Sequence, residues 1–204
     1  SFYMAWLLSL QAQGTRLVNG PHGASLMQYK PFQLETFRRI GAAIPRTLIS
    51  NDPDEVWRFQ KSMPATVFKP LMGGALTERL DANAMESIDS IRASPVIFQE
   101  QIDGDDVRVM LVGSDVVSSV AIRTPEQHLD FRADPVYSRG DAAYEPVVLP
   151  SSIVELCQRA AQTCGLLFAG IDLKRTASGG FVFLELNSSP IYLDVELKLS
   201  HPIS

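Results

Sequence analysis

The sequence predicts a mixed α+β fold in which antiparallel hairpins form much of the sheet. Expected strands and helices come in pairs, without the strict strand–helix–strand rhythm of a parallel sheet. Two turn signals, Gly113-Ser114 and Ser178-Gly179, each separate two apolar runs of strand length. The runs cover 107–112 with 116–123, and 167–175 with 181–186. These two hairpins and the paired order of the elements are the basis for the fold class.

Four helices are expected from apolar spacing and from residues that favour helix ends. They cover residues 2–12, 31–40, 54–61 and 152–164. In the first, Phe2, Trp6 and Leu10 recur at intervals of four, and the segment lacks the basic flank and cleavage site of a signal peptide. We therefore interpret it as a buried helix. In the second, Pro31 suits a first turn and Gly41 suits the exit.

Further strands are expected at three apolar runs bounded by proline or by turn residues. These runs cover 46–49, 65–69 and 95–102. Loops are expected at 19–23 and 72–75, where glycine and proline interrupt the pattern. Residues 124–146 are rich in charge, proline and glycine, so we expect a long surface loop that includes a short strand.

Composition excludes several classes of protein. The 204 residues are 46% hydrophobic and 20% charged, which is enough apolar material for a sizeable core. A net charge of −5 gives no overall basic field for nucleic acid, and no run of 18 apolar residues predicts a membrane span, so a cytoplasmic protein is expected. Cys157 and Cys164 lie in an expected helix and form no CxxC pair, so we interpret both as core residues.

The hairpin near residue 178 predicts an acidic pair. If the chain turns at Ser178-Gly179, antiparallel register places Leu173 opposite Leu184 and Asp172 directly opposite Glu185. Directly opposed residues have Cβ atoms about 5 Å apart, so the two carboxylates repel each other unless a cation lies between them. The register therefore predicts that a cation is needed at this point of the sheet.

Asn187 lies two residues beyond Glu185, so it points to the same face of the strand. Two carboxylates and an amide oxygen on one patch of sheet are ligands that suit Mg²⁺. The alternative is a solvent-facing strand with scattered polar residues. Apolar residues on both faces of the strand indicate burial instead, and a buried carboxylate pair without a cation is costly.

Two lysines and a pair of glycines predict a phosphate site. Lys69 ends the apolar run 66–68 and is followed by Gly73-Gly74, whose backbone N–H groups can approach an anion closely. Lys30 precedes a helix N-terminus, where anions are stabilised. Each lysine also has a plain alternative, because Lys69 could extend to water from a strand edge and Lys30 could be a solvated loop lysine.

Taken together, these segments resemble the ATP-grasp superfamily, and within it the RimK-type and glutathione-synthetase-like carboxylate–amine ligases. The resemblance covers about residues 15–201, and its pieces occur in family order. The pieces are Lys30 with Gln33-Leu34, 41–47, 67–70 with Gly73-Gly74, 98–102, 104–108, 130–132, 170–172 and 185–190. The most specific piece is the E-x-N-x-x-P segment that begins at Glu185, paired with the G-x-D segment that ends at Asp172.

The resemblance implies a role for each matched residue. Phosphate would be contacted by Lys30, Lys69, Gly73 and Gly74, and Mg²⁺ or Mn²⁺ would be held by Asp172, Glu185 and Asn187. The adenine hinge would consist of Glu100, Gln101 and Ile102, and Asp106 would lie near the ribose. The reacting carboxylate and the γ-phosphate would be faced by Arg108 and Arg132. Asp134 would also contact the cofactor, although the RimK type carries Asn at this position.

The same resemblance implies an ATP-grasp fold of two α+β lobes with mainly antiparallel sheets that grip ATP between them. Residues 1–29 would be the remnant of a truncated N-terminal domain, 30–102 the small lobe or lid, and 103–204 the metal-binding lobe. The implied reaction joins a peptide or amino-acid carboxylate to an amine through an acyl phosphate. Nucleic acid and membrane partners are not expected, and a homo-oligomer is left open.

Two other functions fit the same residues. A small-molecule kinase would use the same nucleotide site, and a non-catalytic module would bind nucleotide without turnover. The intact set Asp172, Glu185 and Asn187 favours catalysis over binding alone. The sequence lacks a Ser-His-Asp or Cys-His arrangement, which agrees with a reaction that needs no protein nucleophile.

Overall fold

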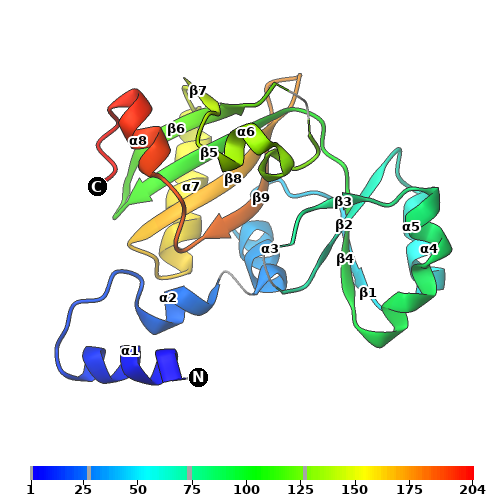
Figure 1. Ribbon diagram of the computed structural model, residues 1–204, viewed down its shortest axis with the longest axis horizontal. Helices are drawn as coiled ribbons and strands as arrows, with labels where there is room; N and C mark the ends of the chain where they lie inside the picture. The colour runs from blue at the N-terminus through cyan, green and yellow to red at the C-terminus, as the bar shows by residue number, and fades with distance from the viewer. Residues whose placement is uncertain (1, 27–28, 73–74, 126–127) are drawn as a thin grey trace.

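The computed structural model describes residues 2–26, 29–72, 75–125 and 128–204, and it consists of two antiparallel sheets with their own helices (Figure 1). The smaller sheet has the strand order β1-β4-β2-β3 and the larger sheet the order β7-β6-β5-β8-β9. The strands are β1 Thr47–Ser50, β2 Thr66–Pro70, β3 Glu78–Arg79, β4 Val96–Glu100, β5 Asp105–Val112, β6 Asp115–Arg123, β7 Ala143–Pro146, β8 Phe168–Arg175 and β9 Phe181–Asn187. The predicted α+β class and both predicted hairpins are confirmed.

Helices surround the two sheets. They are α1 Phe2–Ala12, α2 Gly20–Leu26, α3 Lys30–Arg39, α4 Pro53–Lys61, α5 Ala82–Glu86, α6 Pro135–Ser138, α7 Ser151–Thr163 and α8 Leu193–Leu199, with 3₁₀ turns η1 Ile88–Ala93 and η2 Phe131–Ala133. The four predicted helices correspond to α1, α3, α4 and α7. Within the described residues, no helix combines the length and the apolar character that crossing a bilayer requires.

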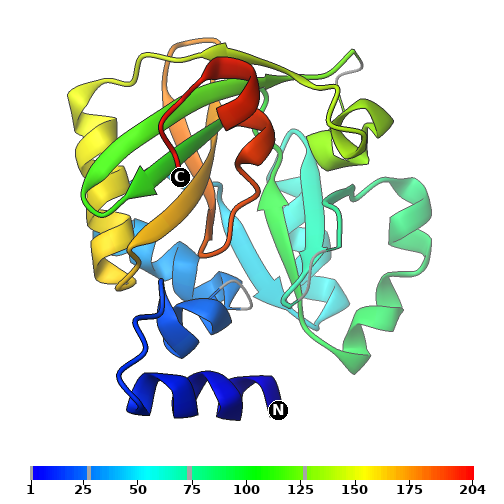
Figure 2. The same ribbon diagram turned by 60° about the vertical axis from the view of Figure 1, so that its left-hand side comes forward.

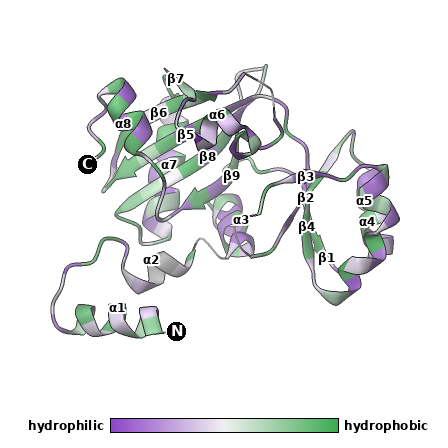
Figure 3. Cartoon of the chain, in the orientation of Figure 1, coloured by the Kyte–Doolittle hydropathy of each residue, from purple (hydrophilic) through white to green (hydrophobic). Residues whose placement is uncertain are grey.

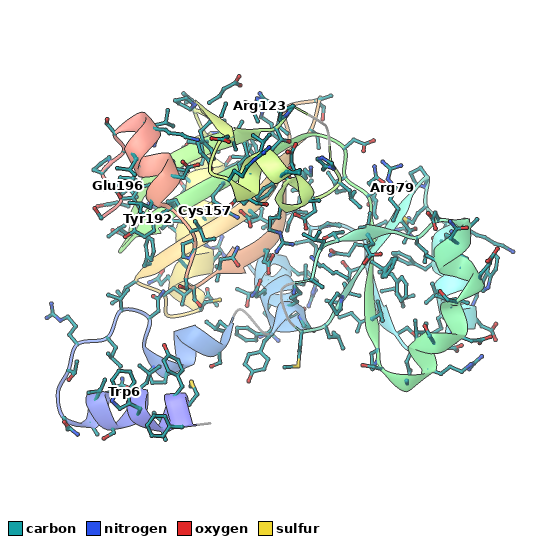
Figure 4. The ribbon with its side chains drawn as sticks, viewed as in Figure 1. Trp6, Arg79, Arg123, Cys157, Tyr192 and Glu196 are labelled. Carbon is teal, nitrogen blue, oxygen red and sulfur yellow. The ribbon has the colours of Figure 1, made fainter. Side chains whose placement is uncertain are left out.

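The larger sheet builds the main core against α3 and α7. Alternate side chains of its central strands, such as Val109 and Ile171, point to this layer and are fully buried. Cys157 on α7 lies in the same layer, and it and Cys164 are buried free thiols, as predicted (Figure 4). The apolar character of these strands is visible along their length (Figure 3).

The smaller sheet has a separate core. Val56 of α4, Ile88 of η1 and Phe98 of β4 are at the centre of this second cluster. Helix α4 begins after Asp52, whose side chain accepts a hydrogen bond from the Asp54 N–H at 3.0 Å, as expected of an N-cap. The two lobes therefore each bury apolar surface of their own.

Helix α3 belongs to the larger lobe. Its Phe37 and the following Ala42 are part of the main core, and Phe37 packs against Phe183 of β9 with ring centroids 5.3 Å apart. Gly41 ends the helix with φ of +82°, a conformation that glycine adopts readily. The sequence resemblance implied that residues 30–102 form the small lobe. In the structure, residues 30–42 pack against the larger sheet instead.

The N-terminal segment differs from the sequence prediction. Helix α1 lies apart from both sheets (Figure 2), and its Phe2 is 87% exposed, so it is not the buried helix that we predicted. The loop predicted at 19–23 is instead the start of α2. Asn19 ends the preceding segment at φ +61°, and its Oδ1 accepts the N–H groups of Leu167 and Phe168 at 2.8 and 3.0 Å. Asn19 thus helps attach this segment to the larger sheet, together with Leu26 of α2, which lies in the main core.

The β8–β9 hairpin contains a β-bulge that the sequence pattern did not reveal. Asp172 lies opposite Glu185, as predicted, but Leu173 lies opposite Phe183 rather than Leu184. Leu184 is therefore the extra residue between these two pairs. The turn spans 176–180 and is one residue longer than assumed. A bulge places two consecutive side chains on the same side of a strand. Leu184 and Glu185 both line the cavity described below, while Phe183 and Leu186 remain in the core.

Candidate active site

A cavity of about 260 Å³ lies between the two sheets. Its walls come from β2 and β4 of the smaller lobe, the segment 101–102, strands β5, β8 and β9 of the larger sheet, and the loop 129–137. The structure brings ten of the predicted site residues to this cavity. They are Lys69, Glu100, Gln101, Ile102, Asp106, Arg108, Arg132, Asp172, Glu185 and Asn187.

A buried arginine pairs with one member of the acidic pair. The Arg108 guanidinium donates to both oxygens of Asp172, with Nε–Oδ1 at 2.8 Å and Nη2–Oδ2 at 3.1 Å. Burial alone would lower the pKa of Arg108, but the Asp172 carboxylate outweighs burial and raises it. Arg108 also donates to the Tyr137 hydroxyl at 3.1 Å and lies over the Phe131 ring. The structure thus supplies positive charge beside the two opposed carboxylates, as their register required.

The residues around this pair fit a hard divalent cation. Asn187 donates from Nδ2 to Asp172 Oδ2 at 3.1 Å, which leaves its amide oxygen for another partner. In the described part of the chain, no three His, Cys, Asp or Glu side chains are arranged so that they alone could hold a metal ion. The candidate ligand set is therefore two carboxylates and one amide oxygen, a chemistry that suits Mg²⁺ together with phosphate oxygens.

Positive side chains face the acidic pair from the other wall. Lys69 of β2 is only 9% exposed, and burial lowers the pKa of its ammonium group. Glu185 acts in the opposite direction on this lysine, whereas Lys30 lowers its pKa further, so all three charges are close enough to interact. Lys30 does not line the cavity itself, but it lies buried at the first residue of α3.

Arg132 lies beside the cavity in an ion pair. Its Nε donates to Asp130 Oδ1 at 2.9 Å, and a second Asp130 oxygen accepts from the Thr77 N–H at 3.2 Å. Thr77 belongs to the smaller lobe, so Asp130 joins the loop of the larger lobe to its neighbour. Arg132 keeps about a third of its side chain exposed, which leaves it able to reach a ligand.

The hinge segment is already partly hydrogen bonded. The Glu100 N–H donates to the Arg46 carbonyl at 2.9 Å, and the Gln101 N–H donates to the Ala65 carbonyl at 3.0 Å. The adenine contacts expected of this segment therefore cannot use these two N–H groups without breaking existing bonds. Carbonyl oxygens of the segment and the neighbouring Ile102 are the groups that a base could meet.

Lys174 is a cavity residue that sequence reasoning missed. Its Nζ lies 2.9 Å from Asp106 Oδ1, and burial raises the pKa of Asp106 despite this ion pair. Its position two residues after Asp172 in a strand was the available signal, because alternate residues share a face. Tyr137 was also missed, and Asp130 was matched only as part of the piece 130–132 without a role of its own, since the place of both residues at the site depends on the path of the loop that carries them.

Among the described residues, Asp134, like Lys30, is a predicted site residue that does not line the cavity. Asp134 caps α6, accepting the Val136 N–H at 2.8 Å, and its other oxygen lies 3.6 Å from His128 Nε2. Its location is that of a helix cap, so the cofactor role predicted for it is not supported. Gly73 and Gly74 lie outside the described residues.

Comparison with known proteins identifies the fold family. Residues 31–201 match the model of the RimK-like ATP-grasp domain. The chain belongs to the RimK-like ATP-grasp family. The resemblance inferred from the sequence motifs is thereby confirmed.

Curated relatives of this RimK-like chain include glutamate ligases. It is 32% identical over 202 residues to the probable alpha-L-glutamate ligase of Alkalilimnicola ehrlichii, covering 93% of this chain and 65% of that protein. It is also 32% identical over 168 residues to the ribosomal protein bS6–L-glutamate ligase of Salmonella paratyphi B, covering 77% of this chain and 54% of that protein. The chain thus spans somewhat less than two thirds of the length of these relatives.

Solved structures confirm the ATP-grasp architecture of the RimK-like chain. The ATP-grasp ligase PsnB, complexed with a minimal precursor, is 35% identical with a TM-score of 0.83, covering 99% of this chain and 66% of that chain. PsnB complexed with a phosphomimetic variant of its minimal precursor, Mg and ADP has the same identity and TM-score, covering 63% of that chain. The macrocyclase MdnC of Microcystis aeruginosa, at 24% identity and TM-score 0.72, shares the fold, covering 86% of this chain and 57% of that chain.

Proposed function

We propose that this chain is the catalytic core of an ATP-dependent ligase that joins a carboxylate to an amine. The observation that carries the proposal is the cavity between the sheets, where Asp172 and Glu185 face Lys69 across a space lined by both lobes. Opposite charges on facing walls suit a nucleotide whose phosphates are bound together with a divalent cation. Relatives named as glutamate ligases and as an ATP-grasp ligase support the same chemistry.

Each wall would contact a different part of the nucleotide. The segment 100–102 would hold the base, and Asp106 would lie near the ribose. Lys69, assisted by Lys30, would neutralise phosphate oxygens. Asp172, Glu185 and Asn187 would hold Mg²⁺, with Mn²⁺ able to take its place. When bound, the cation would neutralise charge on the β- and γ-phosphates.

The reaction proceeds by two displacements. A substrate carboxylate oxygen attacks the γ-phosphorus, ADP leaves, and an acyl phosphate forms. The amine nitrogen then attacks the acyl carbon, loses a proton and displaces inorganic phosphate, which gives an amide. Arg108 and Arg132 would orient carboxylate and phosphoryl oxygens, since a guanidinium binds such groups through two parallel hydrogen bonds. The protein contributes position and positive charge rather than a nucleophile.

We further propose that the carboxylate belongs to a peptide or an amino acid. The bS6–L-glutamate ligase acts, by its name, on a ribosomal protein, and PsnB is complexed with precursor peptide. The exposed Ile191 and the neighbouring Pro190 lie at the cavity and give the substrate side an apolar rim.

The test compares Glu185→Ala with Glu145→Ala. Glu145 is an exposed carboxylate of β7 in the same sheet and does not line the cavity, so it serves as a matched control. We expect Glu185→Ala to lose more Mg²⁺·ADP affinity than the loss of about 10–100-fold that is typical when an outer partner of a metal site is removed. Its melting temperature should stay close to that of Glu145→Ala. Calorimetry with Mg²⁺·ADP measures the affinity, and turnover is measured with ATP, glutamate and candidate peptides.

Product analysis separates the three functions. Amide, ADP and phosphate in equal amounts support ligation. A phosphorylated product with ADP and no free phosphate would instead identify a kinase, and binding without turnover a non-catalytic module. Unchanged Mg²⁺·ADP affinity in a folded Glu185→Ala protein would refute the metal assignment.

A further inference from the structure

Gln33 on α3 is a buried polar side chain, 2% exposed, with no assigned role in the reaction. Both ends of its amide are hydrogen bonded. Its Oε1 accepts the Leu186 N–H at 3.0 Å, and its Nε2 donates to the Leu26 carbonyl at 2.9 Å. Leu186 stands between Glu185 and Asn187, so the amide of Gln33 holds the backbone of the residue that separates the two proposed metal ligands.

Strand β9 needs this partner because it lies at the end of the larger sheet. One edge of the strand pairs with β8, and the other edge presents backbone groups that require partners of another kind. The Phe183 N–H donates to the Ala43 carbonyl at 2.8 Å, and the Leu186 N–H donates to Gln33. In a regular strand, N–H groups on one edge recur every second residue. Here they are three residues apart, because the extra residue Leu184 lies between them.

The outer edge of β9 is therefore fastened on both sides of the bulge. Ala43 holds the strand before Leu184 and Gln33 holds it after Glu185. A β-bulge leaves its extra residue unpaired in the ladder and weakens the local pairing with the neighbouring strand. The two outer hydrogen bonds compensate at the point where Glu185 turns toward the cavity.

Gln33 also connects strand β9 to the helix that carries Lys30. Lys30 lies one helical turn earlier on α3, and residues three apart share a face of a helix. Lys30 acts electrostatically on Lys69, which lines the cavity opposite Glu185. The hydrogen bond between Gln33 and β9 thus fixes the helix that carries Lys30 against the strand that carries Glu185.

We propose that Gln33 is a positioning residue that sets the placement of Glu185 and Asn187 relative to Lys30, without touching the nucleotide. The inference rests on the proposed function, since the positioned residues matter only if metal and phosphate bind here. Loss of an outer partner at a metal site typically costs about 10–100-fold in affinity. The expected consequence is a selective loss of affinity for nucleotide in the presence of the cation.

The experiment compares Gln33→Met with Thr36→Val. Met fills a similar volume but cannot accept the Leu186 N–H. Thr36 is a buried polar residue of the same helix, 4% exposed, and its hydroxyl acts on the pKa of the Cys164 thiol. Both substitutions remove a buried polar group from α3, but only Gln33 is hydrogen bonded to the strand that carries the acidic residues. Calorimetry measures the affinity for Mg²⁺·ADP and, in the presence of a chelator, for ADP alone.

We expect Gln33→Met to weaken Mg²⁺·ADP binding about 10-fold or more, with a much smaller effect on metal-free ADP. Thr36→Val should lower the melting temperature by a similar amount and leave both affinities unchanged. Hydrogen exchange should show faster exchange of the Leu186 amide in Gln33→Met. Equal losses for both variants, or Mg²⁺·ADP affinity at the wild-type level in Gln33→Met, would overturn the proposal.

Gln33→Asn provides a second variant in case Gln33→Met does not fold. It keeps the amide chemistry but is one methylene shorter, so it cannot span from Leu26 to Leu186 without moving α3 or β9. The same selective loss is expected, and wild-type affinity in this variant counts against the inference. If the wild-type chain itself fails to bind Mg²⁺·ADP, the proposed function fails first, and that outcome is distinct from a variant that binds as the wild type does.

Discussion

At the scale of single residues, Arg108 has the contacts of a charge-balancing group. It is 7% exposed and donates to both oxygens of Asp172, while Glu185 stands opposite Asp172 on the next strand. Removing one member of a buried ion pair leaves an uncompensated charge and typically costs about 3–5 kcal/mol. An exposed pair contributes about 0–1 kcal/mol. This contrast leads to a prediction about stability and metal.

Arg108→Ala should destabilise the protein by about 3–5 kcal/mol in the absence of divalent cations. Millimolar Mg²⁺ should restore part of that loss, because a cation can replace the guanidinium beside the carboxylates. Urea unfolding with and without Mg²⁺ measures both effects. Arg123→Ala is the control, since Arg123 pairs with Asp105 and Glu145 near the surface and away from the cavity (Figure 4). An equal Mg²⁺ response in the two variants would contradict the prediction.

Lys69 predicts opposite pH dependences for stability and binding. Because burial lowers its folded-state pKa below the ordinary value of 10.5, the unfolded chain binds a proton that the folded chain has released. Stability without nucleotide should therefore rise with pH between the lowered pKa and 10.5. Mg²⁺·ADP affinity should fall over the same range, since a neutral amine no longer attracts phosphate. The comparison is with Lys69→Met, and Lys61→Met at an exposed site of α4 is the control. If stability and Mg²⁺·ADP affinity change with pH in the same way in Lys69→Met and in the wild type, this lysine is not the source of the pH dependence.

At the scale of elements, the bulge in β9 decides which side chains reach the cavity. Leu184 and Glu185 follow each other in the chain and still line the same space, whereas a regular strand would send one of them to the core. The result is an apolar side chain directly beside a carboxylate. Removing the extra residue should restore the regular alternation while Asp172 stays opposite Glu185.

Deletion of Leu184 should therefore give a folded protein with the acidic pair intact and a changed cavity wall. We expect a small change in melting temperature and about a 10-fold loss of ADP affinity, because an apolar side chain worth about 1.5–3 kcal/mol when buried is removed from the wall. Deletion of Val182 is the comparison. It also restores alternation, but it moves the fully buried Phe183 out of the core and should destabilise far more. If both deletions unfold the chain equally, the bulge has a role beyond aiming these side chains.

The same element shows how far the sequence could predict the structure. The long elements α4, α7, β5, β6, β8 and β9 were predicted, because their apolar spacing extends over many residues. Short elements such as α2, α5 and α6 were missed, because so few residues depend on tertiary contacts for their helical form. The opposition of Asp172 and Glu185 was predicted, although the turn length and the bulge were not, and the two errors cancelled at this pair.

Site residues on strands were easier to predict than those on loops. Glu185 and Asn187 share a face by strand periodicity, Asp172 joins them through the register of the hairpin, and all three line the cavity. Asp130 and Tyr137 reach it only through the path of the segment 124–142, which no local pattern encodes. Asp134 is the converse case, since a carboxylate assigned to the site through the family resemblance caps a helix in the structure.

At the scale of the whole molecule, the two lobes have separate apolar cores and both line the cavity that holds the candidate site. A ligand that contacts both walls stabilises the folded state by mass action, by about 2.7 kcal/mol at a hundred times its dissociation constant. For a chain of this size, that corresponds to a rise in melting temperature of roughly 5–11 °C.

Mg²⁺·ADP at that excess should accordingly raise the melting temperature by roughly 5–11 °C and sharpen the transition. Sharpening is expected because the nucleotide links two cores that otherwise unfold with little mutual support. Scanning calorimetry measures both quantities, and Glu185→Ala serves as the control for the metal-dependent part. An unchanged melt at millimolar nucleotide would argue strongly against nucleotide binding at the cavity.

The separation of the cores has a mechanical consequence. The chain passes between the lobes at residues 43–46 and 101–104, and the Thr77–Asp130 hydrogen bond is a further link between them. Swinging one lobe away from the other would stretch this link and turn the two connecting segments, yet neither apolar interior would be exposed to water. Separating the two lobes to release a bound nucleotide would then break a few polar contacts and would not require part of the chain to unfold.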